Sequence, residues 1–154
     1  MKQDDYYQER NLKNLDRIEE LLRELPLFCE DFLRGVEMRT SVLTRLNYCY
    51  DLRIFFDFLV KKRIRGKQVT DLTLEDLERV TDTDIEIYLS YLSNYTFRGR
   101  RLSCDERAKA RKLSAVRSLF KYFFNKGLIE VNNTAKVPTP SSMRKRSSVL
   151  NRMK

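Results

Sequence analysis

Positive side chains are concentrated in one segment of this 154-residue chain, where their spacing would place many of them on one face of a helix. Residues 98–126 contain 10 Lys and Arg against two acidic residues. When residues 103–126 are set about 100° apart, an apolar stripe lies on one side and Arg107, Arg111, Ser114 and Ser118 lie opposite it. Long cations between small polar side chains can reach phosphate groups, so this face predicts binding to a polyanion.

The charge of the whole chain is divided in the same way. The net charge is +9, but residues 1–97 carry −4, residues 98–126 carry +8 and residues 127–154 carry +5. Nucleic acid is the first candidate partner for such a basic pole, because its phosphates attract clustered Lys and Arg. A solvated basic face that serves only solubility is the alternative that charge alone leaves open.

Several kinds of chemistry are excluded by residue type. The chain has no His, which removes Ser-His-Asp and Cys-His catalysis and the common metal sites that contain His. Its three cysteines, Cys29, Cys49 and Cys104, are widely spaced and form no CxxC pair, so we expect no disulfide framework, no metal and no cofactor. Without a long apolar run or a signal peptide, the sequence predicts a soluble, cytoplasmic protein with no membrane partner.

The elements that position these residues are predicted to be helices, because 42% of residues are apolar and there are only 4 Gly and 3 Pro. No segment alternates convincingly as a strand. The helix over 103–126 has Ser103 as its predicted N-cap with Glu106 completing a capping box, and Gly127 ends it. The predicted helices span 12–25, 27–35, 41–62, 73–80, 82–94 and 103–126, with a basic loop at 96–103. Gly35 is expected to end the second of them, Thr40 or Ser41 to cap the third and Thr73 to cap the fourth.

Four parts of the sequence are recognisable. The run at 110–123, ARKLSAVRSLFKYF, resembles the "RxLSAVRxLFxYL" helix of the core-binding, SAM-like domain of tyrosine recombinases, the phage-integrase and Xer class. Residues 72–92 resemble the middle segment of that domain, and 132–135 followed by Pro138 resemble its exit into an interdomain linker. An earlier helix of the family is matched in spacing by Thr44, Tyr48, Asp51, Leu52, Phe55 and Phe58.

The resemblance covers about residues 25–140 and implies an all-α fold. That fold is a four- to five-helix orthogonal bundle with a flexible basic C-terminal tail. The corresponding domains are an N-terminal helical extension at 1–26, the core-binding domain at 27–131, and an interdomain linker with a basic tail at 132–154. The expected role is to clamp one side of a DNA recombination site.

Catalysis in this family belongs to a second domain that these residues do not contain. Its chemistry uses a Tyr nucleophile, two Arg, a Lys and His or His-like partners, whereas this chain has no His and no matching Arg motif. We therefore expect no catalytic residue here, and we interpret Tyr48 as part of the core. The implied partners are double-stranded DNA, the catalytic domain of the same polypeptide and other recombinase protomers in a synaptic complex. The isolated domain is expected to be monomeric.

Three groups of residues are predicted to face DNA. At the start of the 41–62 helix, the alternative to DNA contact is that Thr40 is only a helix cap and Arg45 is only solvated. In the basic loop, the alternative to a phosphate clamp is a mobile loop without a DNA contact. Cys49 is interpreted as a small core residue. The predicted DNA-facing residues are Arg39, Thr40, Thr44, Arg45 and Asn47, then Arg98, Arg100 and Arg101 in the loop, then Arg107, Lys109, Arg111, Lys112, Ser114, Arg117, Ser118 and Lys121.

Two other functions remain open at the level of sequence. One is an all-α protein-interaction adaptor whose basic face meets an acidic partner. The other is a small DNA-binding transcriptional regulator, although the chain lacks the short second helix after a tight Gly turn that such proteins use. A reading frame that continues past Lys154 into a segment with paired Arg, His and a late Tyr would favour the recombinase.

Overall fold

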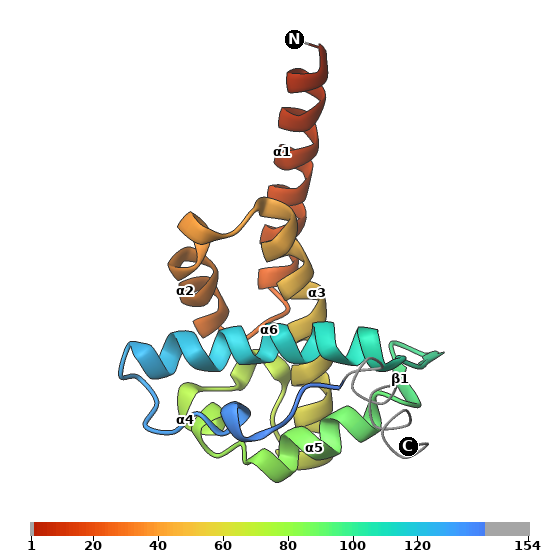
Figure 1. The fold of residues 1–154 in the computed structure, drawn as a ribbon, viewed down its shortest axis with the longest axis vertical. Helices are drawn as coiled ribbons and strands as arrows, with labels where there is room; N and C mark the ends of the chain where they lie inside the picture. Colours follow the sequence, from red (N-terminus) through yellow and green to blue (C-terminus); the bar gives the residue numbers. More distant parts are fainter. Residues whose placement is uncertain (1, 141–154) are drawn as a thin grey trace, which may run out of the picture.

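Two long helices, α3 (Val42–Phe58) and α6 (Glu106–Asn125), cross at the centre of the computed structural model, which describes residues 2–140 (Figure 1). The remaining α-helices of that range are α1 (Lys2–Leu22), α2 (Phe28–Gly35), α4 (Leu74–Glu78) and α5 (Asp82–Tyr91). Short turns of 3-10 or π helix lie at Glu37–Arg39, Leu59–Arg63, Val69–Asp71 and Asn133–Lys136. The predicted all-α fold is confirmed.

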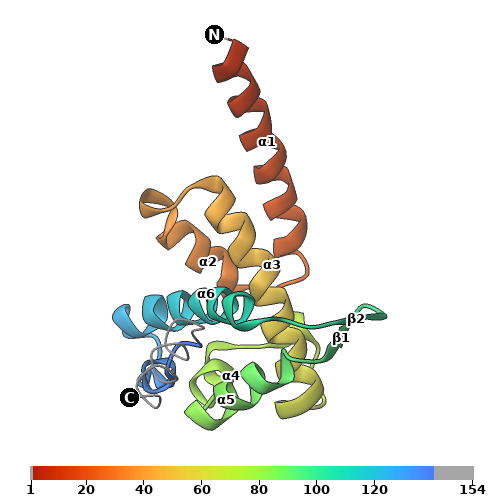
Figure 2. The ribbon, with the colours of Figure 1, turned by 45° about the vertical axis from the view of Figure 1, so that its right-hand side comes forward.

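Helix α1 is longer than its sequence pattern predicted. It begins at Lys2 rather than near Leu12, and its first half extends away from the other helices (Figures 1 and 2). Only the second half packs along α3, through the buried residues Ile18 and Leu21. The exposed first half has no regular apolar stripe, which is why the periodicity did not indicate it.

Side-chain caps mark the starts of α3, α4, α5 and α6. Ser41, one of the two predicted caps, accepts a hydrogen bond from the Thr44 amide at 3.1 Å. Thr73 caps α4 as predicted and Thr81 caps α5, and each forms a full capping box. At α6 the prediction of Ser103 was wrong: Asp105 is the N-cap, and its carboxylate accepts from the Ala108 amide at 2.8 Å.

The predicted basic loop contains a β-hairpin, so the expectation of no strand was also wrong. Strands β1 (Tyr95–Phe97) and β2 (Arg100–Leu102) pair antiparallel, and the hairpin projects beside the start of α6 (Figure 2). Its two turn residues, Arg98 and Gly99, both have positive φ, as a tight hairpin turn requires. Strands of three residues are too short to give a recognisable alternation.

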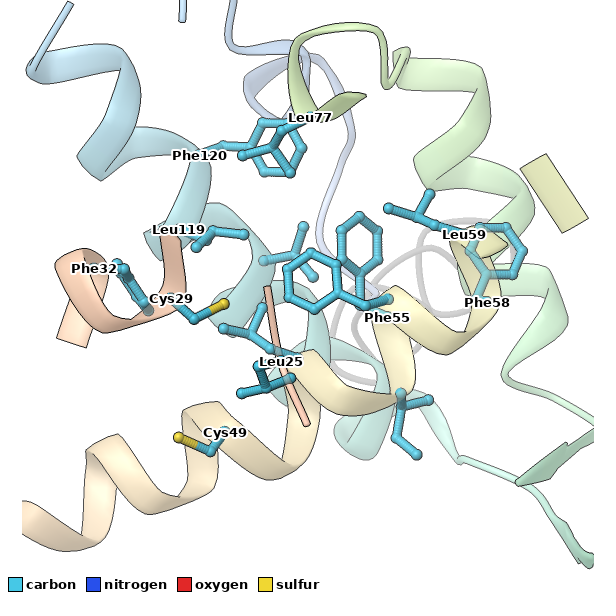
Figure 3. Close-up of a cluster of buried hydrophobic side chains, with 14 of the residues drawn as sticks. Leu25, Cys29, Phe32, Cys49, Phe55, Phe58, Leu59, Leu77, Leu119 and Phe120 are labelled. Carbon is cyan, nitrogen blue, oxygen red and sulfur yellow. The ribbon is translucent and has the colours of Figure 1, made fainter. Parts of the chain in front are cut away.

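Aromatic rings form much of the core between α2, α3, α5 and α6 (Figure 3). Phe55 of α3 packs against Tyr88 of α5 and Phe120 of α6, with ring centroids 5.1 and 6.3 Å apart. Cys49 lies in this core, as predicted, and burial raises the pKa of its thiol to about 12. The core therefore holds α3 against its neighbours along most of its length.

The first part of the predicted linker is packed onto the helices. Thr134 and Val137 are buried, and the Asn133 amide donates to the Val80 carbonyl at 2.9 Å. Arg117 of α6 donates to the Val137 carbonyl and to the Thr139 hydroxyl. The predicted basic tail at 141–154 lies outside the described residues, and the domain boundaries stay predictions.

Gly35 ends α2, as predicted, and also allows a close contact between helices. A Cβ at this position would collide with the ring of Tyr122 on α6. The glycine is therefore required by the packing of α2 against α6.

We predict that Gly35→Ala lowers the free energy of unfolding by roughly 1–3 kcal/mol, because the added methyl overpacks this contact. Urea unfolding would measure the change. Tyr122→Leu in the same chain should recover part of the loss, since it removes the colliding ring. An equal loss with Tyr122 and with Leu at that position would contradict this explanation.

Candidate nucleic-acid interface

The outward face of α6 is the one that the sequence predicted. Arg107, Arg111, Ser114 and Lys121 are exposed and Ser118 is half-buried. No carboxylate follows Glu106 on this helix. The buried stripe on the other side contains Leu113, Val116, Leu119, Phe120 and Phe123.

Helix α3 crosses α6 beside this face and adds polar side chains to it. The Tyr48 hydroxyl is 3.3 Å from the Ser118 hydroxyl, and Asn47 beside it is exposed. The Tyr48 ring packs on Phe32, with centroids 5.6 Å apart, in agreement with a core position. The predicted DNA-facing residues of α3 and those of α6 are 60 or more residues apart in the sequence. They nevertheless meet where the two helices cross.

A buried carboxylate joins the two helices beneath this surface. Asp51 of α3 is 2% exposed, and its Oδ1 accepts from the Lys112 ammonium at 3.0 Å and from the Arg111 guanidinium at 3.2 Å. The Arg111 side chain is 61% exposed, so one end of the network opens to solvent. Asp51 thereby holds Arg111 in place on the surface.

Lys112 occupies a different position from the one predicted. It is 8% exposed and its charge is paired with Asp51, so it lies under the surface rather than on it. A buried ammonium that already has a carboxylate partner is poorly placed to contact phosphate. We therefore leave Lys112 out of the candidate interface.

Arg45 and Thr40 also serve the fold. The buried guanidinium of Arg45 donates to the carbonyls of Glu37 and Thr40, at 3.1 and 2.8 Å. Thr40 donates to the Val36 carbonyl at 2.7 Å. Neither alternative from the sequence holds, because Ser41 is the cap and Arg45 is not solvated.

Two more predicted cations of α6 are engaged within the protein. The Lys109 ammonium donates to the Ser93 hydroxyl at 2.6 Å. Arg117 is half-buried between α6 and residues 137–139, and burial lowers the pKa of its guanidinium. Near α3, Arg39 is exposed and Thr44 is half-buried. DNA contact by any of these residues stays a prediction.

The three arginines of the predicted loop are displayed by the hairpin. Arg98, Arg100 and Arg101 are all exposed at or beside its turn. Arg98 pairs with Glu24 at 2.8 Å, and the Arg101 Nε donates to the Asn94 amide oxygen at 3.0 Å. These contacts connect the hairpin to the turn after α1 and to the turn after α5. Contact of the hairpin with phosphate stays a prediction.

A neighbouring group of residues was missed in the sequence. Glu24 and Arg53 contact the hairpin, and Tyr50 and Arg17 extend this group along α3 and α1. Only the Tyr50–Arg53 pair has a helical spacing that could have indicated contact; the other contacts depend on the tertiary fold.

Residues 2–140 form neither a cluster of metal ligands nor a membrane-spanning helix. In that range no three Cys, Asp or Glu side chains gather as metal ligands. No helix there is both long and apolar enough to cross a bilayer.

Comparison with known proteins identifies the family. Residues 30–127 match the family described as "Phage integrase, N-terminal SAM-like domain". This chain belongs to the phage integrase N-terminal SAM-like domain family. The SAM-like match covers α3–α6 and the hairpin, which carry most of the candidate interface. No solved structure gives a significant match.

Relatives of this SAM-like domain are named tyrosine recombinases. Tyrosine recombinase XerC of Caldanaerobacter subterraneus is 31% identical over 123 residues, which is 75% of this chain and 34% of the relative. Tyrosine recombinase XerS of Streptococcus mutans is 27% identical over 113 residues, 70% of this chain and 32% of the relative. The chain thus spans about a third of the length of these relatives.

The buried ion pair gives a stability prediction. Asp51→Asn should lower the free energy of unfolding by about 3–5 kcal/mol, because it leaves the Lys112 charge buried without a counterion. The double change Asp51→Leu with Lys112→Met should cost much less, since both charges are removed together. Guanidinium unfolding would measure both. Equal destabilisation by the single and double changes would contradict the pairing.

Proposed function

We propose that this domain binds double-stranded DNA through the crossing of α3 and α6, and that it clamps one side of the recombination site of a tyrosine recombinase. The proposal is supported mainly by the side chains on the outward face of α6. Arg107, Arg111 and Lys121 stand on it between small polar residues, with the polar start of α3 alongside.

The side chains on this surface suit two kinds of DNA contact. The exposed cations are long enough to reach phosphates on either side of a groove. Ser114 and Ser118 are small, so the helix backbone can approach the DNA closely, and the Asn47 amide can both donate to and accept from a base edge. Phosphate contacts would supply most of the affinity, and these polar residues would supply sequence preference.

Cutting and rejoining of DNA would belong to another part of the protein. The relatives named tyrosine recombinases are about three times as long as the matched region, which leaves room for a separate catalytic domain. This chain has no His, and Tyr48 is engaged with Phe32 and Ser118. We therefore propose that this domain grips DNA while a catalytic domain of the same polypeptide acts on it, in assembly with other protomers.

Binding to a random duplex at several salt concentrations tests this proposal. Replacing Arg107, Arg111 and Lys121 together with Gln should weaken binding and reduce the log–log salt slope by roughly 1 for each lost phosphate contact. Fluorescence anisotropy would measure both quantities, with circular dichroism to verify folding.

The matched control replaces Lys62, Arg65 and Arg79 with Gln. These exposed cations lie beyond the other end of α3 and directly after α4, and their loss changes the net charge equally. The proposal is wrong if the control loses as much affinity as the test variant. A folded wild-type chain without salt-dependent binding would instead favour the protein-interaction adaptor.

A further inference from the structure

Three guanidinium groups and two aromatic rings stack where α1, α3 and β1 meet; we name Arg17, Arg53 and Arg98, with Tyr50 and Phe97, the Arg53 cluster. The Arg53 Cζ lies 5.3 Å from the centre of the Tyr50 ring and 4.9 Å from that of Phe97. Arg17 covers Tyr50 at 5.6 Å, and Arg98 covers Phe97 at 5.2 Å. Stacking holds these side chains in place, so little conformational entropy remains to be lost on binding an anion.

The positive charge of this cluster is only partly compensated. Glu24 is shared: one oxygen is 2.8 Å from Arg98, whereas the other is 3.9 Å from Arg53. Arg17 pairs with Glu20 at 2.8 Å and donates to the Tyr50 hydroxyl at 3.0 Å. The Arg53 Nε is buried and donates to no acceptor within residues 2–140. Burial, and then the nearby charge of Arg98, lower the pKa of Arg53.

The position of Glu24 indicates where an anion can sit. Its carboxylate is the one anionic group of the described residues that lies within 4 Å of both Arg53 and Arg98. A DNA phosphodiester carries one negative charge on two non-bridging oxygens, as a carboxylate does, and matches the planar fork of arginine at least as well. A single exposed carboxylate is also a weak competitor, because surface ion pairs contribute little.

The cluster borders the proposed DNA surface. Tyr50 follows Asn47 by three residues on α3, so the two side chains lie on the same side of the helix. The hairpin that carries Phe97 and Arg98 also displays Arg100 and Arg101 to solvent. A duplex lying on α3 and α6 could therefore continue onto this cluster without a change in the fold.

We propose that the Arg53 cluster binds a phosphodiester group of DNA, and that Glu24 occupies the phosphate position in the free protein. This inference rests on the proposed function and adds to it a second contact on the DNA backbone. It also gives Glu24 a definite role: its carboxylate competes with DNA phosphate for Arg53 and Arg98 and lowers the affinity for duplex.

The test compares Glu24→Gln with Asp31→Asn in the 154-residue chain. Both changes remove one exposed carboxylate that pairs with an arginine, and Asp31 pairs with Arg34 on α2, away from the hairpin. Glu24→Gln should tighten duplex binding about two- to fivefold at low salt, the effect of roughly one exposed ion pair. The salt slope should steepen by about 1, the value for one added phosphate contact. Asp31→Asn should leave the slope unchanged, and adding Arg98→Gln to Glu24→Gln should remove the gain.

The remaining outcomes distinguish a failure of this inference from a failure of the proposed function. If wild type binds DNA but Glu24→Gln behaves like Asp31→Asn, the inference is wrong and the proposed function stands. If folded wild type binds no duplex, the proposed function itself fails.

An NMR titration distinguishes the source of the phosphate. Duplex DNA should shift the Arg53 Nε resonance more in Glu24→Gln than in wild type. A shift with inorganic phosphate alone, together with an unchanged DNA salt slope, would mean a site for free anions and would overturn the assignment to DNA.

Discussion

The ion pair between Asp51 and Lys112 is the interaction on which the candidate interface depends. It lies beneath the surface where α3 and α6 cross, and it connects one charged group on each helix. Burying two charges costs much of the energy that their attraction returns, so such a pair contributes more to a defined arrangement than to stability. Here the arrangement has a visible consequence, because the same carboxylate also holds Arg111 at the exposed edge.

The fold separates the basic residues of α6 into two groups. Lys109, Lys112 and Arg117 are engaged by Ser93, Asp51 and the segment at 137–139, respectively. Arg107 and Lys121 stand on the outward face together with Arg111. The basic segment therefore serves two purposes: some cations fasten the helix to its neighbours, and the others leave a positive surface for the proposed partner.

Much of the fold could be predicted because its signals are local. The apolar stripe of α6 and the caps at Ser41 and Thr73 depend on residues a few positions apart, and all of them are confirmed. Asp105 was missed because Ser103 offers an equally plausible cap when only α6 is considered. The hairpin was missed because strands this short carry almost no pattern.

The candidate site was less predictable, because charge does not reveal what a cation contacts. Lys112 and Arg111 are neighbours in sequence and both contact Asp51, about 60 residues earlier, yet one is buried and the other exposed. The same limit applies to Arg53, whose aromatic and arginine neighbours come from three elements. Long-range contacts of this kind require the structure.

The most direct test of the central claim is an NMR titration of the isotopically labelled chain with a short duplex, following backbone amides. If DNA binds at the crossing of α3 and α6, the largest shifts occur at Asn47, Ser114 and Ser118 and along the outward face of α6, and they fade as salt is added. Shifts confined to α2, α4 or α5, or no shifts at low salt from a folded chain, would contradict that claim.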